Sequence, residues 1–246
     1  MLKLTGVGKR YPDGLAALEG LDLTIRDGSF TSIVGPSGCG KSTLLRLIAG
    51  LAAPTEGAIT GLDEGSIGLV FQDATLMPWA DVFANVYLPF RLAGVSRVAA
   101  SPRIEEALSL VGLLDFRGAY PRALSGGMRM RVAIARAIAT KPRLLLMDEP
   151  FAALDEITRN KLNDDLLRLW REGDFTTIFI THSVFESVYL STDIAVMTAR
   201  PGRIFARYEI AGPTARDSEF RASAVYLDGC RAVSRDLERV MSMGAP

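Results

Sequence analysis

Long apolar stretches, an excess of one charge, and a supply of cysteine or histidine are all missing from this chain of 246 residues. No apolar run approaches the roughly 20 residues of a membrane-spanning helix, so we predict none. Lysine plus arginine and aspartate plus glutamate number 28 each. That balance does not indicate nucleic acid or an acidic membrane surface as a partner. The opening MLKLTGVGK lacks the apolar segment of a secretion signal.

The two cysteines, Cys39 and Cys230, do not have the spacing of metal ligands, and we interpret both as small apolar side chains. A disulfide framework is not expected, which is typical of a reducing compartment. Internal repeats and low-complexity segments are also missing. A hydrophobic content of 48% and a charged content of 23% instead indicate an ordinary folded protein with a packed core.

Strand and helix patterns alternate along both ends of the chain. Short apolar runs bounded by turn residues predict strands at Leu2–Val7, Leu21–Ile25, Thr31–Val34, Ile67–Phe71, Arg143–Met147, Thr176–Ile180 and Asp193–Met197. Helical patterns predict helices at Ser42–Ala49, Glu156–Trp170 and Ser183–Leu190. This alternation predicts an α/β fold with a mostly parallel sheet core and an antiparallel β subdomain at the N-terminus.

A helical lobe interrupts this alternation at residues 74–140. Helices are predicted there at Asp81–Leu92, Arg103–Val111 and Met128–Ala139. We therefore predict a single domain, 1–246, with a core at 1–73 and 141–212, the inserted lobe, and a helical tail at 213–246. The tail is expected to pack on the body through a stripe at helical spacing, formed by Tyr226, Cys230, Val233, Leu237 and Val240.

The segment GPSGCGKS, residues 35–42, lies between a predicted strand and a predicted helix and matches the P-loop pattern. Its glycines let successive N–H groups converge on phosphate oxygens, and the helix N-terminus adds positive potential. Lys41 adds a full charge, and Ser42 offers a hydroxyl to Mg²⁺. The predicted phosphate-binding residues are Gly35, Pro36, Ser37, Gly38, Cys39, Gly40, Lys41, Ser42 and Thr43.

A second part of a nucleotide site follows the apolar run LLLM, which ends in Asp148 and Glu149. Asp148 is placed to hold Mg²⁺, whereas Glu149 suits a general base that orients the attacking water. The single histidine, His182, follows another predicted strand. Because ligands of open α/β sheets collect at the carboxyl ends of strands, we expect His182 at the same edge as Lys41 and Asp148.

A second glycine-rich helix start occurs at LSGG, residues 124–127, which raises the question of why one chain carries two anion-seeking helix N-termini. The ordered set of motifs resembles the nucleotide-binding subunit of ATP-binding cassette (ABC) transporters, a family of P-loop NTPases, over essentially the whole chain. The resemblance implies that Ser125, Gly126 and Gly127 contact the γ-phosphate of ATP held by a second copy. Two copies related by a two-fold axis would then sandwich two ATP molecules.

Other roles are implied by position in the resemblance. Gln72 would meet Mg²⁺ and the water, Asp155 would reach across the dimer, and Tyr11 would stack on adenine. A place for Tyr11 in the core or at its rim is the alternative. Met128 and Met130 stand where the family frequently has glutamine. Met128 occurs in some importer subfamilies, whereas Met130 is the less usual residue.

Three segments, 73–79, 181–186 and 200–203, look like the nitrate/sulfonate/taurine group of importers. That resemblance implies transmembrane permease subunits, an extracytoplasmic solute-binding protein, and a peripheral location on the cytoplasmic face of the inner membrane. Met77, Pro78 and Trp79 form a candidate patch for docking a partner's helix. The alternative is that these three residues cap the core of the helical lobe.

Two competing functions fit the sequence less well. A cassette ATPase that works on DNA or ribosomes commonly carries long coiled-coil insertions or two cassettes in one chain, and this sequence has neither, nor an evident basic stripe. A P-loop kinase or GTPase leaves residues 125–127 and His182 without a role. We therefore expect an ATPase that uses ATP and Mg²⁺ to power import of a small solute, with no nucleic acid as partner.

Overall fold

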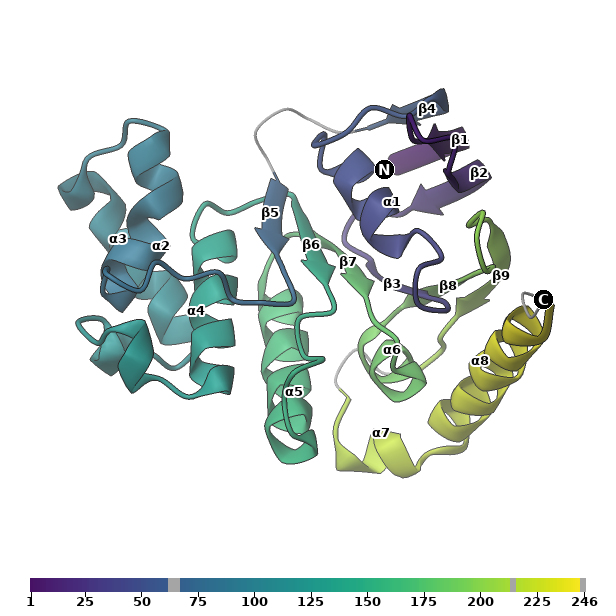
Figure 1. The fold of residues 1–246 in the computed structure, drawn as a ribbon. Coiled ribbons are helices and arrows are strands. Elements are labelled where there is room, and N and C mark those ends of the chain that lie inside the picture. Colours follow the sequence, from purple (N-terminus) through teal and green to yellow (C-terminus); the bar gives the residue numbers. More distant parts are fainter. Residues whose placement is uncertain (62–66, 213–215, 244–246) are drawn as a thin grey trace. The chain divides into compact units, whose positions relative to one another are not determined.

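The computed structural model describes residues 1–61, 67–212 and 216–243, and the chain divides into two compact units. Unit 1 comprises Met1–Glu64 and Thr176–Pro246, and unit 2 comprises Gly65–Phe175. We describe each unit by itself (Figure 1). The predicted tail includes residues 213–215 and 244–246, which lie outside the described residues. The division of one domain into core, lobe and tail stays a prediction.

Unit 1 begins with the predicted antiparallel sheet. Strands β1 (Leu2–Arg10), β2 (Ala16–Ile25) and β4 (Glu56–Thr60) pair in the order β2-β1-β4. Alternating buried residues in β1 and β2 reflect a sheet with one face on the core. The strand β4 was not predicted, because its residues are exposed or half-buried and give little apolar periodicity.

Parallel strands form the centre of unit 1. Strands β3 (Phe30–Val34), β7 (Thr176–Ile180) and β8 (Asp193–Met197) pair in parallel in the order β7-β3-β8, and β9 (Ile204–Glu209) adds to β8 in antiparallel orientation. All residues of β3 and β7 are buried, as expected for strands covered on both faces. The register places the carboxyl ends of β3, β7 and β8 at one edge.

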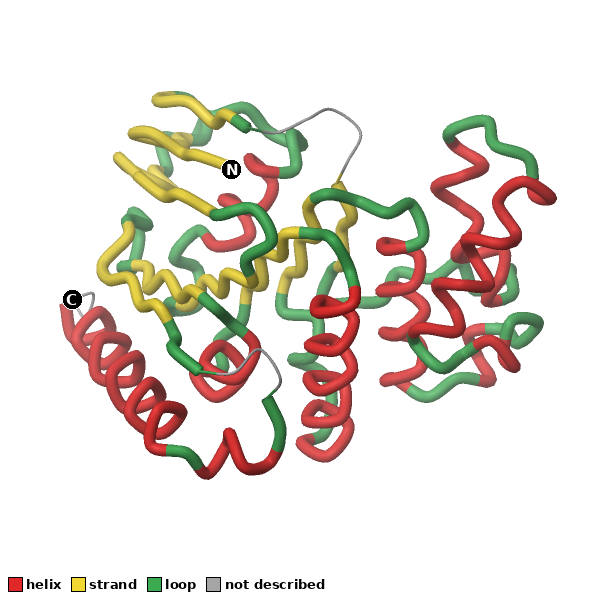
Figure 2. The backbone as a smooth tube through the Cα atoms, turned by 180° about the vertical axis from the view of Figure 1, so that it is seen from behind, coloured by secondary structure: helices red, strands yellow, loops and turns green. Residues whose placement is uncertain are grey.

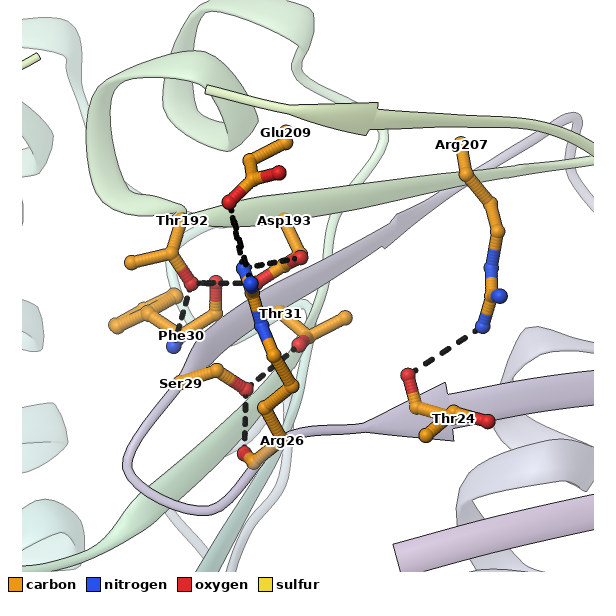
Figure 3. Close-up of polar contacts among 9 residues, drawn as sticks. All are labelled: Thr24, Arg26, Ser29, Phe30, Thr31, Thr192, Asp193, Arg207 and Glu209. Carbon is orange, nitrogen blue, oxygen red and sulfur yellow. Dashed lines mark hydrogen bonds and ion pairs between the residues drawn. The ribbon is translucent and has the colours of Figure 1, made fainter. Parts of the chain in front are cut away.

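At the opposite ends of β3 and β8, a polar network joins the strands to the end of β2 (Figure 3). Arg26 donates to both carboxylate oxygens of Asp193, at 2.9 and 3.0 Å, and to Glu209 at 3.1 Å. The Thr192 hydroxyl donates to Asp193 at 2.7 Å and accepts from the Phe30 N–H at 3.2 Å. The hydrogen bonds with Asp193 and Glu209 raise the pKa of Arg26, so the guanidinium stays charged.

The helices of unit 1 are α1 (Lys41–Ile48), α6 (Val184–Leu190), α7 (Ser218–Ala222) and α8 (Ala224–Met243). Helix α8 packs against α6, β8 and β9 (Figure 1). Four members of the predicted stripe are buried and Leu237 is half-buried, so the described part of the tail packs on the body as predicted. No helix within the described residues is long and apolar enough to cross a membrane.

Unit 2 contains the parallel strands β5 (Ile67–Val70) and β6 (Leu144–Asp148), together with its helices. The helices are α2 (Val82–Leu92), α3 (Arg97–Leu110), α4 (Gly126–Ile138) and α5 (Glu156–Glu172), with short 3₁₀ turns at Leu114–Phe116 and Pro121–Ala123. Helices α2, α3 and α4 pack on one another as the predicted helical lobe (Figure 2). Helix α3 begins earlier than predicted, because Ser96 caps it and Pro102 is accommodated inside the helix.

Helices α4 and α5 begin side by side, at two capped N-termini. The Ser125 hydroxyl accepts from the Met128 N–H at 3.2 Å, and the Asp155 carboxylate accepts from the Thr158 N–H at 3.0 Å. A Cβ atom added at Gly127 would lie 2.7 Å from Cγ2 of Thr158. The close approach of the two helix starts therefore requires glycine at position 127.

This contact predicts a selective effect of alanine at the two neighbouring glycines. Gly127→Ala should lower the free energy of unfolding by about 1–3 kcal/mol, as overpacking typically does. Gly126→Ala is the matched control, because its Cβ would meet Leu154 at an ordinary 3.4 Å. Thr158→Ser removes the methyl group that clashes and should restore the Gly127→Ala variant. Urea denaturation of Gly127→Ala, Gly126→Ala and the double variant, each against the unchanged protein, checks this, and equal losses at both glycines would contradict it.

Candidate functional site

The P-loop segment of unit 1 connects β3 to α1 and surrounds the ammonium group of Lys41. Lys41 is only 6% exposed, and its Nζ donates to the carbonyls of Gly35 at 2.9 Å and Pro36 at 3.0 Å. Gly40 precedes the helix with φ at 105°, a left-handed conformation that favours glycine. The ammonium group of Lys41 therefore lies inside the loop that the sequence predicted to bind phosphate.

Helix α1 differs from the other helices in how it begins. Within the described residues no side chain caps it, and its first residue is Lys41. A Ser or Asp side chain caps each of α2, α3, α4, α5, α6 and α7. The first N–H groups of any helix lack partners within the helix. At α1 these groups and the positive end of the helix dipole are suited to an external anion.

Tyr11 lies beside this loop. Its hydroxyl and that of Thr43 are 3.2 Å apart, and the Lys9 ammonium is 5.6 Å from the centre of its ring. The side chain is half-buried, so it belongs to the rim of unit 1 and not to its core. Stacking of Tyr11 on adenine stays a prediction.

His182 follows β7 at the same strand edge as the P-loop, as expected from the register of β3 and β7. The Thr181 hydroxyl donates to the Glu186 carboxylate at 2.5 Å and accepts from the Ser183 N–H at 3.0 Å. Glu186 is buried, whereas His182 is exposed. Glu186 thus fixes the turn that presents His182. Sequence reasoning missed it, although a glutamate among apolar residues of a short helix is a signal.

A second residue missed by sequence reasoning is Arg200. It lies in the turn between β8 and β9, in the segment 200–203, which was singled out from the sequence only for its likeness to one group of importers. Its Nε and Nη2 atoms donate to the Gly38 carbonyl at 3.1 and 2.9 Å. The signal in the sequence was the segment RPGR, but its contact with a loop 162 positions away was not foreseeable.

Unit 2 brings Gln72, Asp148 and Glu149 to the carboxyl edge of its two strands. Val70 is paired with Met147; Asp148 and Glu149 follow Met147 directly, and Gln72 lies two residues after Val70. Gln72 is exposed, and both acids are half-buried. Glu149 has φ at 46°, a left-handed conformation that costs a residue other than glycine about 1–3 kcal/mol. The chain thus changes direction between the two acids, which separates the roles that Asp148 and Glu149 can take.

The two capped helix starts of unit 2 share one arrangement. Arg129 donates to the Leu124 carbonyl at 2.7 Å, and Arg159 donates to the Leu154 carbonyl at 2.8 Å. Each bond fixes the residue just before a cap, Ser125 in one case and Asp155 in the other. Ser125, Gly126 and Asp155 are exposed, so both corners can be reached from outside. The hydrogen bond from the Thr158 N–H lowers the pKa of Asp155.

The two methionines next to this corner differ in environment. Met130 is 4% exposed and lies on the buried face of α4, together with Ile134, Ala137 and Ile138. Met128 is half-buried. Met130, which stands where the family frequently has glutamine, is therefore part of the apolar core of the helical lobe. Methionine is commonly found in such a core.

The sequence of the chain matches the family model described as ABC transporter over residues 18–152. It is 47% identical over 208 residues to an uncharacterized ABC transporter ATP-binding protein of Methanocaldococcus jannaschii, which covers 82% of this chain and 78% of the relative. It is 46% identical over 208 residues to the taurine import ATP-binding protein TauB of Rhizobium johnstonii, covering 82% of this chain and 79% of TauB.

Solved structures show the same fold. One is a dimeric ATP-binding cassette in a post-hydrolysis state bound to ADP and Pi, with a TM-score of 0.74 and 34% identity, covering 87% of this chain and 100% of that one. Another is cbiO1 from Clostridium perfringens, part of an ABC transporter complex, with a TM-score of 0.77 and 28% identity, covering 98% and 97%. This protein therefore belongs to the ABC transporter family and is an ATP-binding ATPase of the P-loop α/β fold.

Proposed function

We propose that this chain is the ATP-hydrolysing subunit of an importer for nitrate, a sulfonate such as taurine, or a related small organic solute. The observation that carries the proposal is the start of α1, where a buried lysine and a helix without a side-chain cap are suited to bind a phosphate chain. The identity with proteins named as taurine import subunits supports the solute class.

The proposed working state is a dimer of two copies around two ATP molecules. The exposed corner at Ser125 and Gly126 would contact the γ-phosphate of ATP held by the other copy's P-loop. The Ser125 hydroxyl accepts a bond from its own helix and retains its O–H to donate. Asp155, held next to that corner, would reach the facing copy. The dimeric cassette bound to ADP and Pi supports this arrangement.

Hydrolysis in this proposal divides the work among a few residues. Lys41 and the N–H groups of α1 hold the phosphates, and Glu149 takes the proton of the attacking water. Gln72 and His182 orient the water and the γ-phosphate. Tyr11 supports the adenine.

Mg²⁺ fits the donor set of the proposed site. No group of three or more His, Cys, Asp and Glu side chains that could hold a metal ion occurs within the described residues. Mg²⁺ commonly binds through one or two carboxylates together with substrate phosphates. Ser42 and Asp148 would hold it in this way, and it would neutralise charge on the phosphates.

Docking to the permease is proposed at the loop that follows Gln72. Arg136 of α4 donates to the carbonyls of Ala74 and Thr75, both at 3.0 Å, and buried Asn85 of α2 holds Met77 at both its N–H and its carbonyl. Trp79, at the end of this loop, is 76% exposed. An exposed tryptophan on a loop anchored at both ends supports docking over the alternative of a core cap.

A groove beside this loop supports the same proposal. It measures about 690 Å³ and is lined by β5, α2 and α4, with Thr75 and Leu88 among its residues. Its apolar walls suit a helix of a permease subunit. Such docking would place the chain at the cytoplasmic face of the inner membrane, with an extracytoplasmic binding protein as an indirect partner. A role on DNA or ribosomes would leave the groove and Trp79 without a purpose.

The general base is tested by Glu149→Gln. ATP affinity should persist while hydrolysis falls about 10²–10⁴-fold, because the proton of the attacking water has no acceptor. The trapped dimer should appear in size-exclusion chromatography with ATP and Mg²⁺. Glu172→Gln, an exposed change at the end of α5, is the matched control. A monomer peak for Glu149→Gln with ATP would count against the proposed dimer.

The docking surface is tested by Trp79→Ala. The variant should keep its melting temperature and its ATPase activity in isolation, because Trp79 is largely exposed. Its co-purification with the permease from detergent-solubilised membranes should fall. Phe116→Ala changes another exposed aromatic residue of unit 2 outside the groove and should have no effect. Normal assembly and coupling of Trp79→Ala would refute this docking surface.

A further inference from the structure

We propose that Arg200 is a positioning residue that holds the P-loop in its phosphate-binding conformation. The inference rests on the proposed phosphate site. Arg200 itself would contact no nucleotide. It acts through the peptide bond between Gly38 and Cys39, to whose carbonyl its guanidinium donates two hydrogen bonds, at 3.1 and 2.9 Å.

This peptide bond is fixed at both ends. Its carbonyl accepts from Arg200, and its N–H, on Cys39, donates to the Pro36 carbonyl at 3.3 Å. Gly38 has φ at +75°, so the chain reverses its conformation just before the fixed bond. Alternation of right- and left-handed residues turns successive N–H groups to one side, which forms an anion-binding nest. The hydrogen bonds from Arg200 keep the Gly38 carbonyl in place, so that this peptide cannot turn over. The neighbouring N–H groups then stay available to the phosphates of the proposed site.

The turn that carries Arg200 is built against the same loop. The Gly202 N–H donates to the Ala17 carbonyl at 2.9 Å, and Gly202 forms a bridge with Leu18. A Cβ atom at Gly202 would lie 2.2 Å from the Cys39 carbonyl oxygen, and one at Gly40 would lie 2.8 Å from the Ala17 carbonyl oxygen. The P-loop is thus confined between the start of β2 and this turn.

The turn also has internal bonds that keep its shape. The Thr198 hydroxyl donates to the Pro201 carbonyl at 3.1 Å and accepts from the Arg203 N–H at 2.9 Å. Arg203 points to another partner, forming an ion pair with Glu19 at 3.0 Å. Of the two arginines in this turn, only Arg200 donates a hydrogen bond to the P-loop within the described part of the chain.

Nucleotide binding by Arg200→Met tests the inference, with Arg203→Met as the matched control. The KM and Kd for ATP should rise roughly tenfold in Arg200→Met, corresponding to the loss of charge-assisted hydrogen bonds, while kcat changes less than about twofold. Arg200→Lys keeps donors near the carbonyl and should recover part of the affinity. Because the two hydrogen bonds also hold the empty loop, the melting temperature without nucleotide should fall slightly, by no more than the tenfold loss of affinity implies, and the stabilisation by ATP should shrink.

Lys41→Ala separates failure of this inference from failure of the proposed site. Loss of ATP binding in Lys41→Ala with normal KM and Kd in Arg200→Met would overturn the role of Arg200 alone. Unchanged binding in Lys41→Ala would overturn the site on which the inference rests. A fall in the melting temperature of nucleotide-free Arg200→Met far beyond that, or a loss of kcat comparable to the loss of affinity, would show a general structural role and would also overturn the inference.

Discussion

The N–H groups at the start of an α-helix have no partner within the helix, and they must find one elsewhere. Most helices of this protein meet this requirement with a Ser or Asp side chain. Helix α1 does not, and its first residue is the buried Lys41. In the proposed site, the triphosphate of ATP would supply the partner of these N–H groups.

The strand register places the other proposed site residues at the carboxyl ends of the strands. In unit 1 the carboxyl ends of β3, β7 and β8 carry the P-loop, His182 and the turn with Arg200. In unit 2 the carboxyl ends of β5 and β6 carry Gln72, Asp148 and Glu149. The polar network around Arg26 lies at the opposite ends of the strands of unit 1 (Figure 3). In unit 1 the supporting network and the proposed site thus lie at opposite ends of the strands.

The corner at Ser125, which we propose contacts ATP held by a second copy, is held in place before any such contact. Its cap and the cap at Asp155 are fixed by one arginine each, and Gly127 allows the two corners to touch. Both corners are exposed. A phosphate group bound at one copy's P-loop would therefore meet a preformed set of donors in its partner, at little cost in ordering.

Buried, continuous patterns were readable in the sequence, and contacts between distant segments were not. Strands β7 and β8 begin and end at the predicted residues, because each is an apolar run that the fold buries. Strands β4 and β9 were not foreseen, since most of their residues are exposed or half-buried. The P-loop residues and the pair Asp148 and Glu149 could be named from local spacing, whereas the roles of Gln72 and Asp155 came only from the resemblance to the family. The bond from Arg200 to Gly38 could not, because it depends on how β8 ends beside the P-loop.

Mixing two defective variants tests directly whether the ATP site is shared between copies. In a Glu149→Gln background, Lys41→Ala removes the cradle and Ser125→Arg blocks the corner. Each variant alone should retain no ATP through rapid gel filtration, whereas the mixture should retain ATP, because a mixed pair keeps one intact site. No retention above that of the separate variants would contradict the account, since a site built within one chain cannot be rescued by a second.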